Sequence, residues 1–232
     1  FERDEVATAA PQVEVLDDKS IARLLDHPRL KGSTSSEAKN RRHMYRQAMV
    51  RSEAAKSFGD DYIEFLRASE IYLEIRPFSA PDMERVVELA QRTNQLNFSG
   101  TKYARDKFDQ VVEEPGLEKY VLECADKYGS YGIIGFWLAS RSPGVLRVRE
   151  LMLSCRVQGK FIEQALLDYL VTTGAPVERV EINFKKTNRN GPAQAVLRRL
   201  GRDLDGDGPL VRTVAPGEFH VDFMEIVTAK TS

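Results

Sequence analysis

The sequence is poor in the features that mark several large classes of protein. Its two cysteines, Cys124 and Cys155, form no spacing motif, so we predict neither a disulfide framework nor a cysteine-based metal site. No apolar run approaches the ~20 residues that a membrane-spanning helix needs. The formal net charge is −1, which excludes a strongly charged polyelectrolyte. No secretory leader is visible, and we expect a reduced, cytoplasmic setting.

Signals for nucleic acid and for metal ions are also missing. Neither a helix-turn-helix pattern nor a basic groove rich in aromatic residues is present, so we expect no nucleic-acid partner. The turn that runs from Asp203 to Gly208 begins like a calcium loop. Its twelfth position is Val214 instead of Glu, and we therefore expect a tight polar turn and no metal.

The chain divides near residue 70. We expect one unit over residues 1–32, a helical linker over 33–70 and an α/β domain over 71–232. The Ser-rich run 32–36 marks the junction between the first two. Between Lys39 and Lys56 there are six basic residues against one acid, Glu53. Such a helix either faces an acidic partner or simply presents a solvated face.

Residues 71–232 alternate between strand and helix patterns. Apolar residues at every second position predict strands over 71–75, 120–125, 132–139, 145–154 and 180–184, with a last strand over 219–227. Helical spacing appears after Ser79, over 103–112, from 161 onward and from 191 to 200. We therefore predict an α/β fold with a mixed, mostly antiparallel sheet flanked by helices.

A strand that enters a helix through a basic, glycine-containing turn is the most informative of these patterns. The strand ends near Ser154, and the helix is predicted to begin at Gly159 or Lys160. A helix N-terminus presents free N–H groups and positive potential, and glycine permits close approach, which together suit a phosphate. Arg156, Gln158, Gly159 and Lys160 are thus candidate phosphate-binding residues. The alternative is an ordinary turn with two solvated cations.

The same pattern follows once more. A strand over 180–184 leads through the basic run 185–189 to Asn190, with Pro192 in the first helical turn and Gly201 at the helix end. Asn190 is a plausible N-cap, and proline and glycine fit these two positions. Two neighbouring helix N-termini can meet at one anionic ligand, so Asn190 joins the candidate set.

A dense polar cluster ends the helix that starts near Ser79. Its members are Arg92, Thr93, Asn94, Gln95 and Asn97. They have the hydrogen-bonding groups to hold a pantetheine arm or an acyl group, or else to cap the helix and order the next loop.

Cys155 stands at the mouth of the first basic turn. A catalytic thiol needs a lowered pKa, which Arg156, Lys160 and a helix N-terminus would favour. The alternative is a buried strand residue with no chemistry.

The order of elements and the two turns resemble the GNAT acyltransferase fold. The stretch from Arg156 to Phe161 resembles the pyrophosphate turn of that family, although Phe161 replaces the small last residue. The stretch from Asn190 to Gly201 resembles the later family pattern, but Leu197 stands where many members have a proton-donating Tyr. The resemblance implies a cleft for acyl-CoA or for the phosphopantetheine of a carrier protein.

The chain also resembles the C-terminal half of FkbH-like proteins of the haloacid dehalogenase (HAD) superfamily. This resemblance rests on Glu88 to Phe98, Leu153 to Gly159 and Thr187 to Gly191, with residues 1–15 and 42–46 similar to the end of a HAD domain and its linker helix. It implies a partner acyl carrier protein, loaded with a glyceryl or related acyl unit for polyketide biosynthesis. No Asp-x-Asp-x-Thr motif is present, so the HAD domain is expected elsewhere, in cis or in trans, and this chain reads as the downstream piece of a larger enzyme.

Three functions remain open from the sequence. The domain is the carrier-facing part of an FkbH-like enzyme, an autonomous acyl-CoA-dependent N-acyltransferase, or a non-catalytic interaction domain. Phe161 and Leu197 weigh against the second.

Overall fold

The computed structural model describes residues 2–27, 30, 40–201, 210–214 and 217–228. The predicted linker at 32–36 and the acidic turn that begins at Asp203 lie outside these residues. The N-terminal part is helical, with α1 (Glu2–Ala9) and the 3-10 segment η1 (Asp18–Asp26). Two further helices, α3 (Arg41–Lys56) and α4 (Tyr62–Ala68), precede the first strand.

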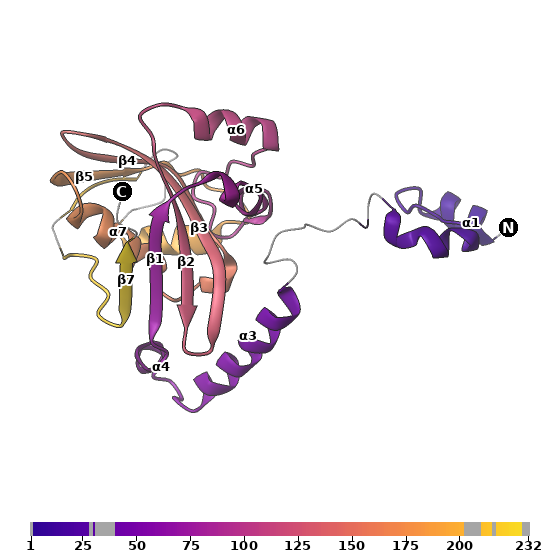
Figure 1. The fold of residues 1–232 in the computed structure, drawn as a ribbon, viewed down its shortest axis with the longest axis horizontal. Helices are drawn as coiled ribbons and strands as arrows, with labels where there is room; N and C mark the ends of the chain where they lie inside the picture. The colour runs from indigo at the N-terminus through magenta and orange to yellow at the C-terminus, as the bar shows by residue number, and fades with distance from the viewer. Residues whose placement is uncertain (1, 28–29, 31–39, 202–209, 215–216, 229–232) are drawn as a thin grey trace.

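A seven-stranded sheet follows, with the strand order β6-β5-β4-β3-β2-β1-β7 (Figure 1). The strands are β1 (Ile71–Pro77), β2 (Glu118–Asp126), β3 (Gly129–Ser142), β4 (Gly144–Leu153), β5 (Val177–Ile182), β6 (Leu210–Thr213) and β7 (Met224–Thr228). Strands β4 and β5 are parallel, as are β1 and β7, and the other neighbouring pairs are antiparallel. The prediction of an α/β fold with a mixed, mostly antiparallel sheet is confirmed.

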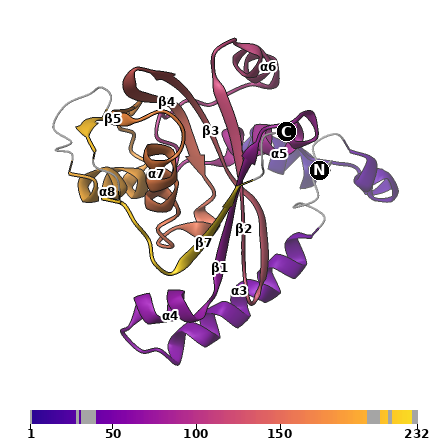
Figure 2. The same ribbon diagram turned by 60° about the vertical axis from the view of Figure 1, so that its left-hand side comes forward.

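Helices cover both faces of the sheet (Figure 2). Because side chains alternate along a strand, Trp137 belongs to one core while its neighbours Phe136 and Leu138 belong to the other. The larger core contains apolar residues of α7 (Ile162–Thr172) and α8 (Gly191–Arg199), and the smaller one contains residues of α5 (Met83–Arg92) and α6 (Arg105–Glu113).

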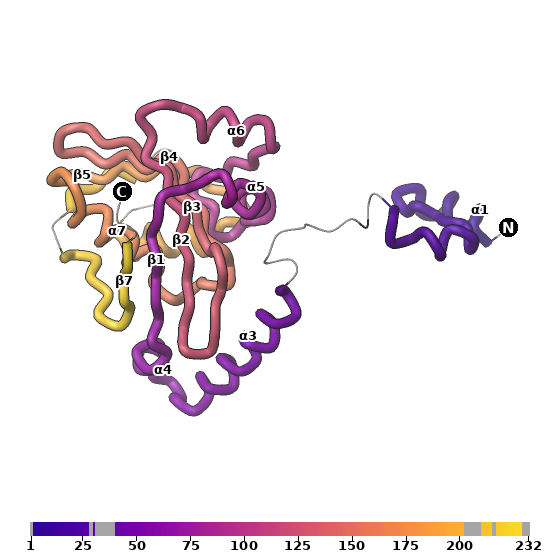
Figure 3. Tube along the Cα trace, viewed as in Figure 1, coloured from indigo at the N-terminus to yellow at the C-terminus, as the bar shows by residue number. Residues whose placement is uncertain are grey.

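The first strand ties the N-terminal helices to the sheet. Figure 3 follows the chain from α4 through β1 to the short η3 (Ala80–Asp82) and α5 at the opposite end of that strand. Phe65 and Leu66 of α4 are buried in the larger core. Helix α4 therefore contributes apolar side chains to the larger core, and the predicted division of the chain near residue 70 stays a prediction.

Two predicted starts differ clearly from the structure, and one strand was not predicted. Helix α7 begins at Ile162, later than predicted, because Gly159 and Phe161 both adopt positive φ, +80° and +61°, which no α-helix permits. The last strand begins only at Met224. Strand β6 was not predicted, since its four residues are too few to show a clear alternation. None of the helices in the described ranges is long and apolar enough to cross a bilayer.

Candidate ligand-binding site

The short extended segment Leu96–Phe98 is inserted where β4 and β5 diverge. The parallel pairing ends at Val148 and Ile182. Beyond that point, β4 pairs with Leu96–Phe98: the Phe98 N–H donates to the Leu151 carbonyl at 3.1 Å, and the Leu153 N–H donates to the Leu96 carbonyl at 3.0 Å. On the other side of the segment, the Lys185 N–H donates to the Phe98 carbonyl at 3.0 Å. The polar cluster is thereby fixed to the ends of both strands.

Asn190 holds this junction together. Its side-chain nitrogen donates to the carbonyls of Asn97 at 3.2 Å and Lys185 at 2.8 Å. Its side-chain oxygen accepts from the Thr187 N–H at 2.8 Å and from Gln194 at 3.0 Å. Asn190 occupies the N-cap position of α8, as predicted, but without a capping hydrogen bond to that helix. The Asn190 side chain is 0 % exposed, and its hydrogen bonds hold the inserted segment in place.

Asn97 has a similar structural part. Its amide nitrogen donates to the Thr101 carbonyl at 2.7 Å, and its amide oxygen accepts from the Gly100 N–H at 2.9 Å. The side chain is 1 % exposed. Both amide ends of Asn97 thus order the loop that follows the insertion.

A cavity of about 880 Å³ lies beside this insertion and is lined by four segments that are distant in the sequence. Its walls come from α3, α5, the loop after α5, the turn after β4 and the turn after β5. The lining residues include Arg41, Met44, Tyr45, Ala48, Arg85, Glu88, Arg92, Thr93, Asn94, Gln95, Cys155, Arg156, Asn188 and Arg189. We call it the arginine cavity.

Positive charge dominates this cavity, because five arginines line it against a single carboxylate, Glu88. Glu88 is 8 % exposed. It forms ion pairs with Arg92 at 2.9 Å, Arg85 at 3.0 Å and Arg41 at 3.7 Å. The side chains of Arg41 and Arg92 are half-exposed. They can turn toward an incoming anion without leaving water first.

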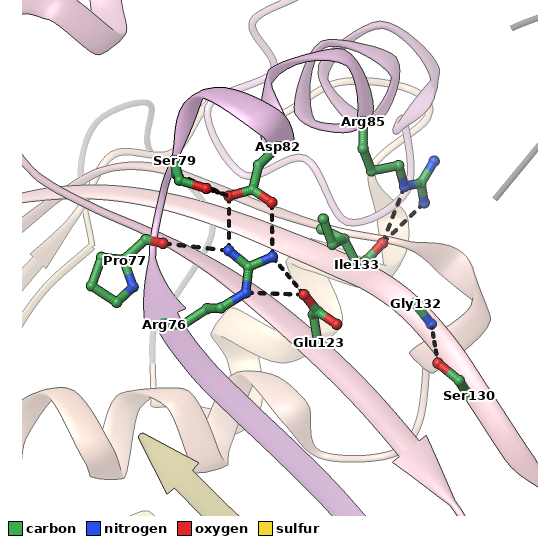
Figure 4. A network of polar contacts seen from close by, with 9 residues as sticks. All are labelled: Arg76, Pro77, Ser79, Asp82, Arg85, Glu123, Ser130, Gly132 and Ile133. Atoms are coloured by element: carbon green, nitrogen blue, oxygen red, sulfur yellow. Dashed lines mark hydrogen bonds and ion pairs between the residues drawn. The ribbon is translucent and has the colours of Figure 1, made fainter. Parts of the chain in front are cut away.

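A second ion-pair network fixes the start of α5, the helix that carries Arg85 and Arg92 (Figure 4). Arg76 on β1 donates to both oxygens of Asp82 at 2.7 and 2.8 Å and to Glu123 at 2.5 Å. Burial pushes the pKa of Asp82 up, but the hydrogen bonds from Arg76 and Ser79 outweigh burial and leave that pKa lowered. Further along the helix, Arg85 donates to the Ile133 carbonyl at 3.1 and 3.2 Å.

Arg156 lines both the arginine cavity and a smaller neighbouring cavity. Its guanidinium donates to Ser154 Oγ at 3.1 Å, to the Ile133 carbonyl at 3.4 Å and to Met44 Sδ at 3.0 Å. These contacts hold it in place while it lines the arginine cavity on one side and a smaller cavity on the other. Arg156 is therefore positioned in advance for a ligand.

The rest of the basic turn faces elsewhere. Gln158 and Lys160 line the smaller cavity, and a Cβ on Gly159 would meet only Tyr62 Oη, at 3.7 Å. At the N-terminus of α7, the buried Glu163 carboxylate is paired with Arg199 at 2.6 Å. A carboxylate there already complements the helix dipole and would repel an anion. The predicted phosphate role of Gln158, Gly159 and Lys160 is untested, and this geometry gives it little support.

The structure thus unites part of the predicted set. Arg92, Thr93, Asn94, Gln95, Cys155 and Arg156 line one cavity, whereas Asn97 and Asn190 build its support. Cys155 is exposed, and none of the described residues around the cavity is a histidine.

Four charged residues of the cavity were not predicted as site residues from the sequence: Arg41, Arg189, Arg85 and Glu88. The last two could have been found. Their signal was present in the spacing of Arg85, Glu88 and Arg92, which places both arginines beside the carboxylate on one helix face.

Metal ions have no evident place in this arrangement. Within the described ranges, no group of three or more His, Cys, Asp or Glu side chains is placed to hold one. The chemistry available in the cavity is anion binding by guanidinium groups, with one accessible thiol.

Comparison with known proteins gives a likeness at the level of the fold. No family model matches the sequence, and no curated protein matches it. Among solved structures, an acetyltransferase from Thermus thermophilus aligns with a TM-score of 0.46 and 16% identity, covering 63% of this chain and 99% of that chain. The ribosomal-protein-S18-alanine N-acetyltransferase from Escherichia coli gives 0.41 and 13%, covering 64% and 99%.

A third similar structure is the PaiA N-acetyltransferase from Thermoplasma acidophilum, in complex with coenzyme A. It aligns with a TM-score of 0.42 and 18% identity, covering 60% of this chain and 96% of that chain. These similarities concern the course of the chain and carry no information about its chemistry.

Proposed function

We propose that the arginine cavity binds the phosphate end of a phosphopantetheine-type acyl ligand, and that the domain presents the acyl group for transfer. The observation that carries this proposal is the lining of an ~880 Å³ cavity by five arginines and one carboxylate. Small-molecule sites commonly have volumes of about 300–1,000 Å³. Guanidinium groups suit phosphate because their planar fork donates two parallel hydrogen bonds.

The walls of the cavity offer both anchors and contacts for a flexible arm. Arg156 and Arg85 are held by hydrogen bonds to backbone carbonyls, whereas Arg92 and Arg189 are exposed at the opening. Leu89 and Leu96 add apolar surface, and Asn94 adds an amide. This mixture suits pantetheine, which alternates amide groups with short apolar links.

The finer proposal is that the arm belongs to an acyl carrier protein. This follows the resemblance to FkbH-like proteins, in which a glyceryl or related acyl unit is loaded and the HAD chemistry lies outside this chain. The exposed residues Arg42 and Arg46 lie on the same helix, α3, as the cavity residues Arg41 and Tyr45. A basic helix beside the opening complements an acidic partner.

Acyl-CoA-dependent N-acyl transfer is the second candidate, since the arginine cavity is equally suited to the phosphates of coenzyme A. The insertion restricts how such a ligand lies. The β4 groups that would bond an arm between β4 and β5, the Leu151 carbonyl and the Leu153 N–H, are already paired with Leu96–Phe98. Leu197 is fully buried in the larger core and donates no proton. An autonomous transferase would need another acid.

Calorimetry with coenzyme A, acetyl-CoA and a phosphopantetheinylated carrier protein tests both proposals. The test variant is Arg92→Gln/Arg189→Gln, at the cavity opening. The matched control is Arg147→Gln/Arg179→Gln, two exposed arginines that pair with Glu181 away from the cavity. Each double variant removes the same charge. We expect roughly tenfold weaker binding in the test variant only, because each exposed ion pair contributes up to about 1 kcal/mol and about 1.4 kcal/mol corresponds to a factor of ten.

Substitutions on α3 distinguish a phosphopantetheine arm on a carrier protein from free coenzyme A. Reversing Arg42 and Arg46 to Glu should weaken carrier-protein binding at least tenfold and leave coenzyme A binding unchanged. Equal loss for both ligands, or for neither, would remove the carrier reading. Equal binding by the test and control variants would remove the arginine cavity as the phosphate site, and turnover of acetyl-CoA with an amine would establish the autonomous transferase instead.

A further inference from the structure

A second, smaller cavity of about 300 Å³ lies on the other side of Arg156. Its walls come from α3, α4, the start of β3 and the turn after β4. They include Met44, Phe65, Tyr131, Arg156 and Lys160. We call it the lysine cavity. None of the described residues in its lining is acidic.

Lys160 is the unusual member of this lining. The residue is 7 % exposed, yet among the described residues its ammonium group has neither a hydrogen bond nor an ion pair. Its nearest partners are aromatic rings, with Nζ at 5.4 Å from the Tyr131 centroid and 6.0 Å from the Phe65 centroid. Burial lowers the pKa of Lys160. A buried cation with only ring contacts is unfavourable unless something else compensates it.

The nearby acid compensates this charge only in part, because other groups already engage its carboxylate. Asp126 is paired with Arg51 at 2.7 Å and accepts from the Tyr131 hydroxyl at 2.6 Å. It also accepts the backbone N–H groups of Tyr128 at 3.0 Å and Gly129 at 3.1 Å. The cluster of Arg51, Asp126 and Lys160 therefore contains one cation in excess, and that excess faces the cavity.

We propose that the lysine cavity binds a small carboxylate, with the carboxylate on Lys160 and the apolar body against α3 and Phe65. The volume equals about ten waters at ~30 Å³ each, which suits a ligand on the order of ten non-hydrogen atoms. Met44, Ala48, Ala55 and Phe65 form the apolar wall. The lysine cavity shares Met44, Ala48 and Arg156 with the arginine cavity, but the carboxylate proposal does not rest on the function proposed there.

Charge selects the ligand class. The lining holds three cations, of which Arg51 is paired with Asp126 and the Arg156 guanidinium already donates to Ser154, Met44 and Ile133. The single ammonium of Lys160 therefore faces the ligand, and it suits a carboxylate, with one charge at neutral pH, better than a phosphate ester, which carries about −1.5 to −2. A neutral amide would leave the ammonium charge unmatched. Tyr62 and Ser130 add hydroxyl groups to the same lining, which suits the second carboxylate oxygen.

The test uses calorimetry and ligand-observed NMR on the whole chain. The probes are benzoate and butyrate, the neutral analogues benzamide and butyramide, and inorganic phosphate. The variant is Lys160→Met, which keeps the length of the side chain and removes its charge. Lys127→Met is the matched control, because Lys127 is exposed and also contacts a tyrosine ring, Tyr128, at 5.4 Å.

The expected result is selective binding of the carboxylates. Each should bind at least tenfold more tightly than its amide and more tightly than phosphate, and Lys160→Met alone should abolish that preference. Lys160→Met should also melt at a higher temperature than the wild-type chain, since a buried charge without an ion pair is removed, and should bind coenzyme A as the wild type does. The higher melting temperature also excludes misfolding as the reason for lost binding.

Three results would overturn the proposal. Amides that bind as well as carboxylates would show that charge is not recognised. Carboxylate binding that survives in Lys160→Met would place the ligand elsewhere. The absence of carboxylate binding to the wild-type chain, or tighter binding of phosphate, would show that the excess cation has another role.

Discussion

The arginine cavity and the lysine cavity share Met44, Ala48 and Arg156, yet their cations differ in exposure to water and in pairing with carboxylates. In the first, most of the arginines are exposed or half-exposed, and a buried carboxylate, Glu88, offsets part of their charge. In the second, one lysine is buried with its charge only partly compensated. Burial, more than the number of cations, decides how strongly each site needs an anion.

The two cavities also differ in the charge of the ligand that each should bind. An exposed guanidinium gains little from any single anion in water, so the arginine cavity depends on several of them acting on a multiply charged group. A buried ammonium gains much from one matched charge. We therefore expect salt-sensitive, phosphate-directed binding in the first cavity and charge-selective carboxylate binding in the second.

The largest effect should come from Asn190→Ala, which breaks the comparison by damaging one cavity only. Four hydrogen bonds, two of them buried and two partly buried, lose their side-chain partner, and stability should fall by about 2–4 kcal/mol in urea unfolding. The insertion at Leu96–Phe98 should loosen, so coenzyme A binding is lost below the unfolding midpoint while benzoate binding persists. Loss of both ligands together, or of neither, would contradict the separate support of the two cavities.

Glu88→Gln tests whether the Glu88 carboxylate offsets the positive charge of the arginine cavity. The variant keeps the shape of the side chain but leaves Arg41, Arg85 and Arg92 without their shared carboxylate. Stability should fall by about 1–2 kcal/mol, because Arg85 is largely shielded from water and the other two arginines are half-exposed. Coenzyme A should bind several-fold more tightly at low salt, as measured by calorimetry. Weaker binding would show that Glu88 itself contacts the ligand.

The pH dependence of stability distinguishes the buried lysine from the exposed arginines. The folded-state pKa of Lys160 lies below its usual value of 10.5, so above that lowered pKa the unfolded chain binds more protons than the folded chain. Wild-type stability should therefore rise relative to Lys160→Met as the pH rises toward 10.5, by about 1.4 kcal/mol for each unit by which the pKa is lowered.

Other groups around Lys160 must be considered in that window. Asp126, Arg51, Cys124 and Tyr131 face it, and burial raises the pKa of Cys124 to about 12 and that of Tyr131 further above its usual range. Thermal unfolding of both proteins from pH 7 to 10.5 measures the difference. A constant difference across this range would mean that Lys160 titrates as an exposed lysine does.

The smallest effect concerns Cys155, which lies in the wall of the arginine cavity and not in that of the lysine cavity. Cys155→Ser should change stability by no more than about 0.5 kcal/mol, because the side chain is exposed. In the wild type, iodoacetamide should modify Cys155 and spare the buried Cys124. Coenzyme A should protect Cys155 from modification, and benzoate should not, as read by mass spectrometry. Protection by benzoate would place both ligands in one site.

Much of the fold was predictable because it depends on local pattern. Alternating apolar residues indicated β1 to β5, and Asn190, Pro192 and Gly201 indicated the bounds of α8. Strand β6 was missed because it is short. The helix start at Ile162 was missed because Phe161 adopts a left-handed conformation that is unusual for a phenylalanine, and its ring packs edge-on against Phe223 at 5.8 Å.

The site was predictable only as separate pieces. The polar run from Arg92 to Asn97, the turn at Arg156 and the turn at Asn190 each stood out in the sequence. Their convergence depends on the backbone pairing of Leu96–Phe98 with β4, which no side-chain pattern encodes. Lys160 lines a different cavity from Cys155 of the same turn, and the positive φ of Gly159 and Phe161 on either side of Lys160 shows that the backbone turns sharply there.

A crystal structure of the protein with 4′-phosphopantetheine is the most direct test of phosphate binding in the arginine cavity. We predict that the phosphate lies within hydrogen-bonding distance of Arg156 and of Arg92 or Arg189. A phosphate bound to the backbone N–H groups of residues 159–162, at the N-terminus of α7, would contradict this prediction and would restore the site first expected from the sequence.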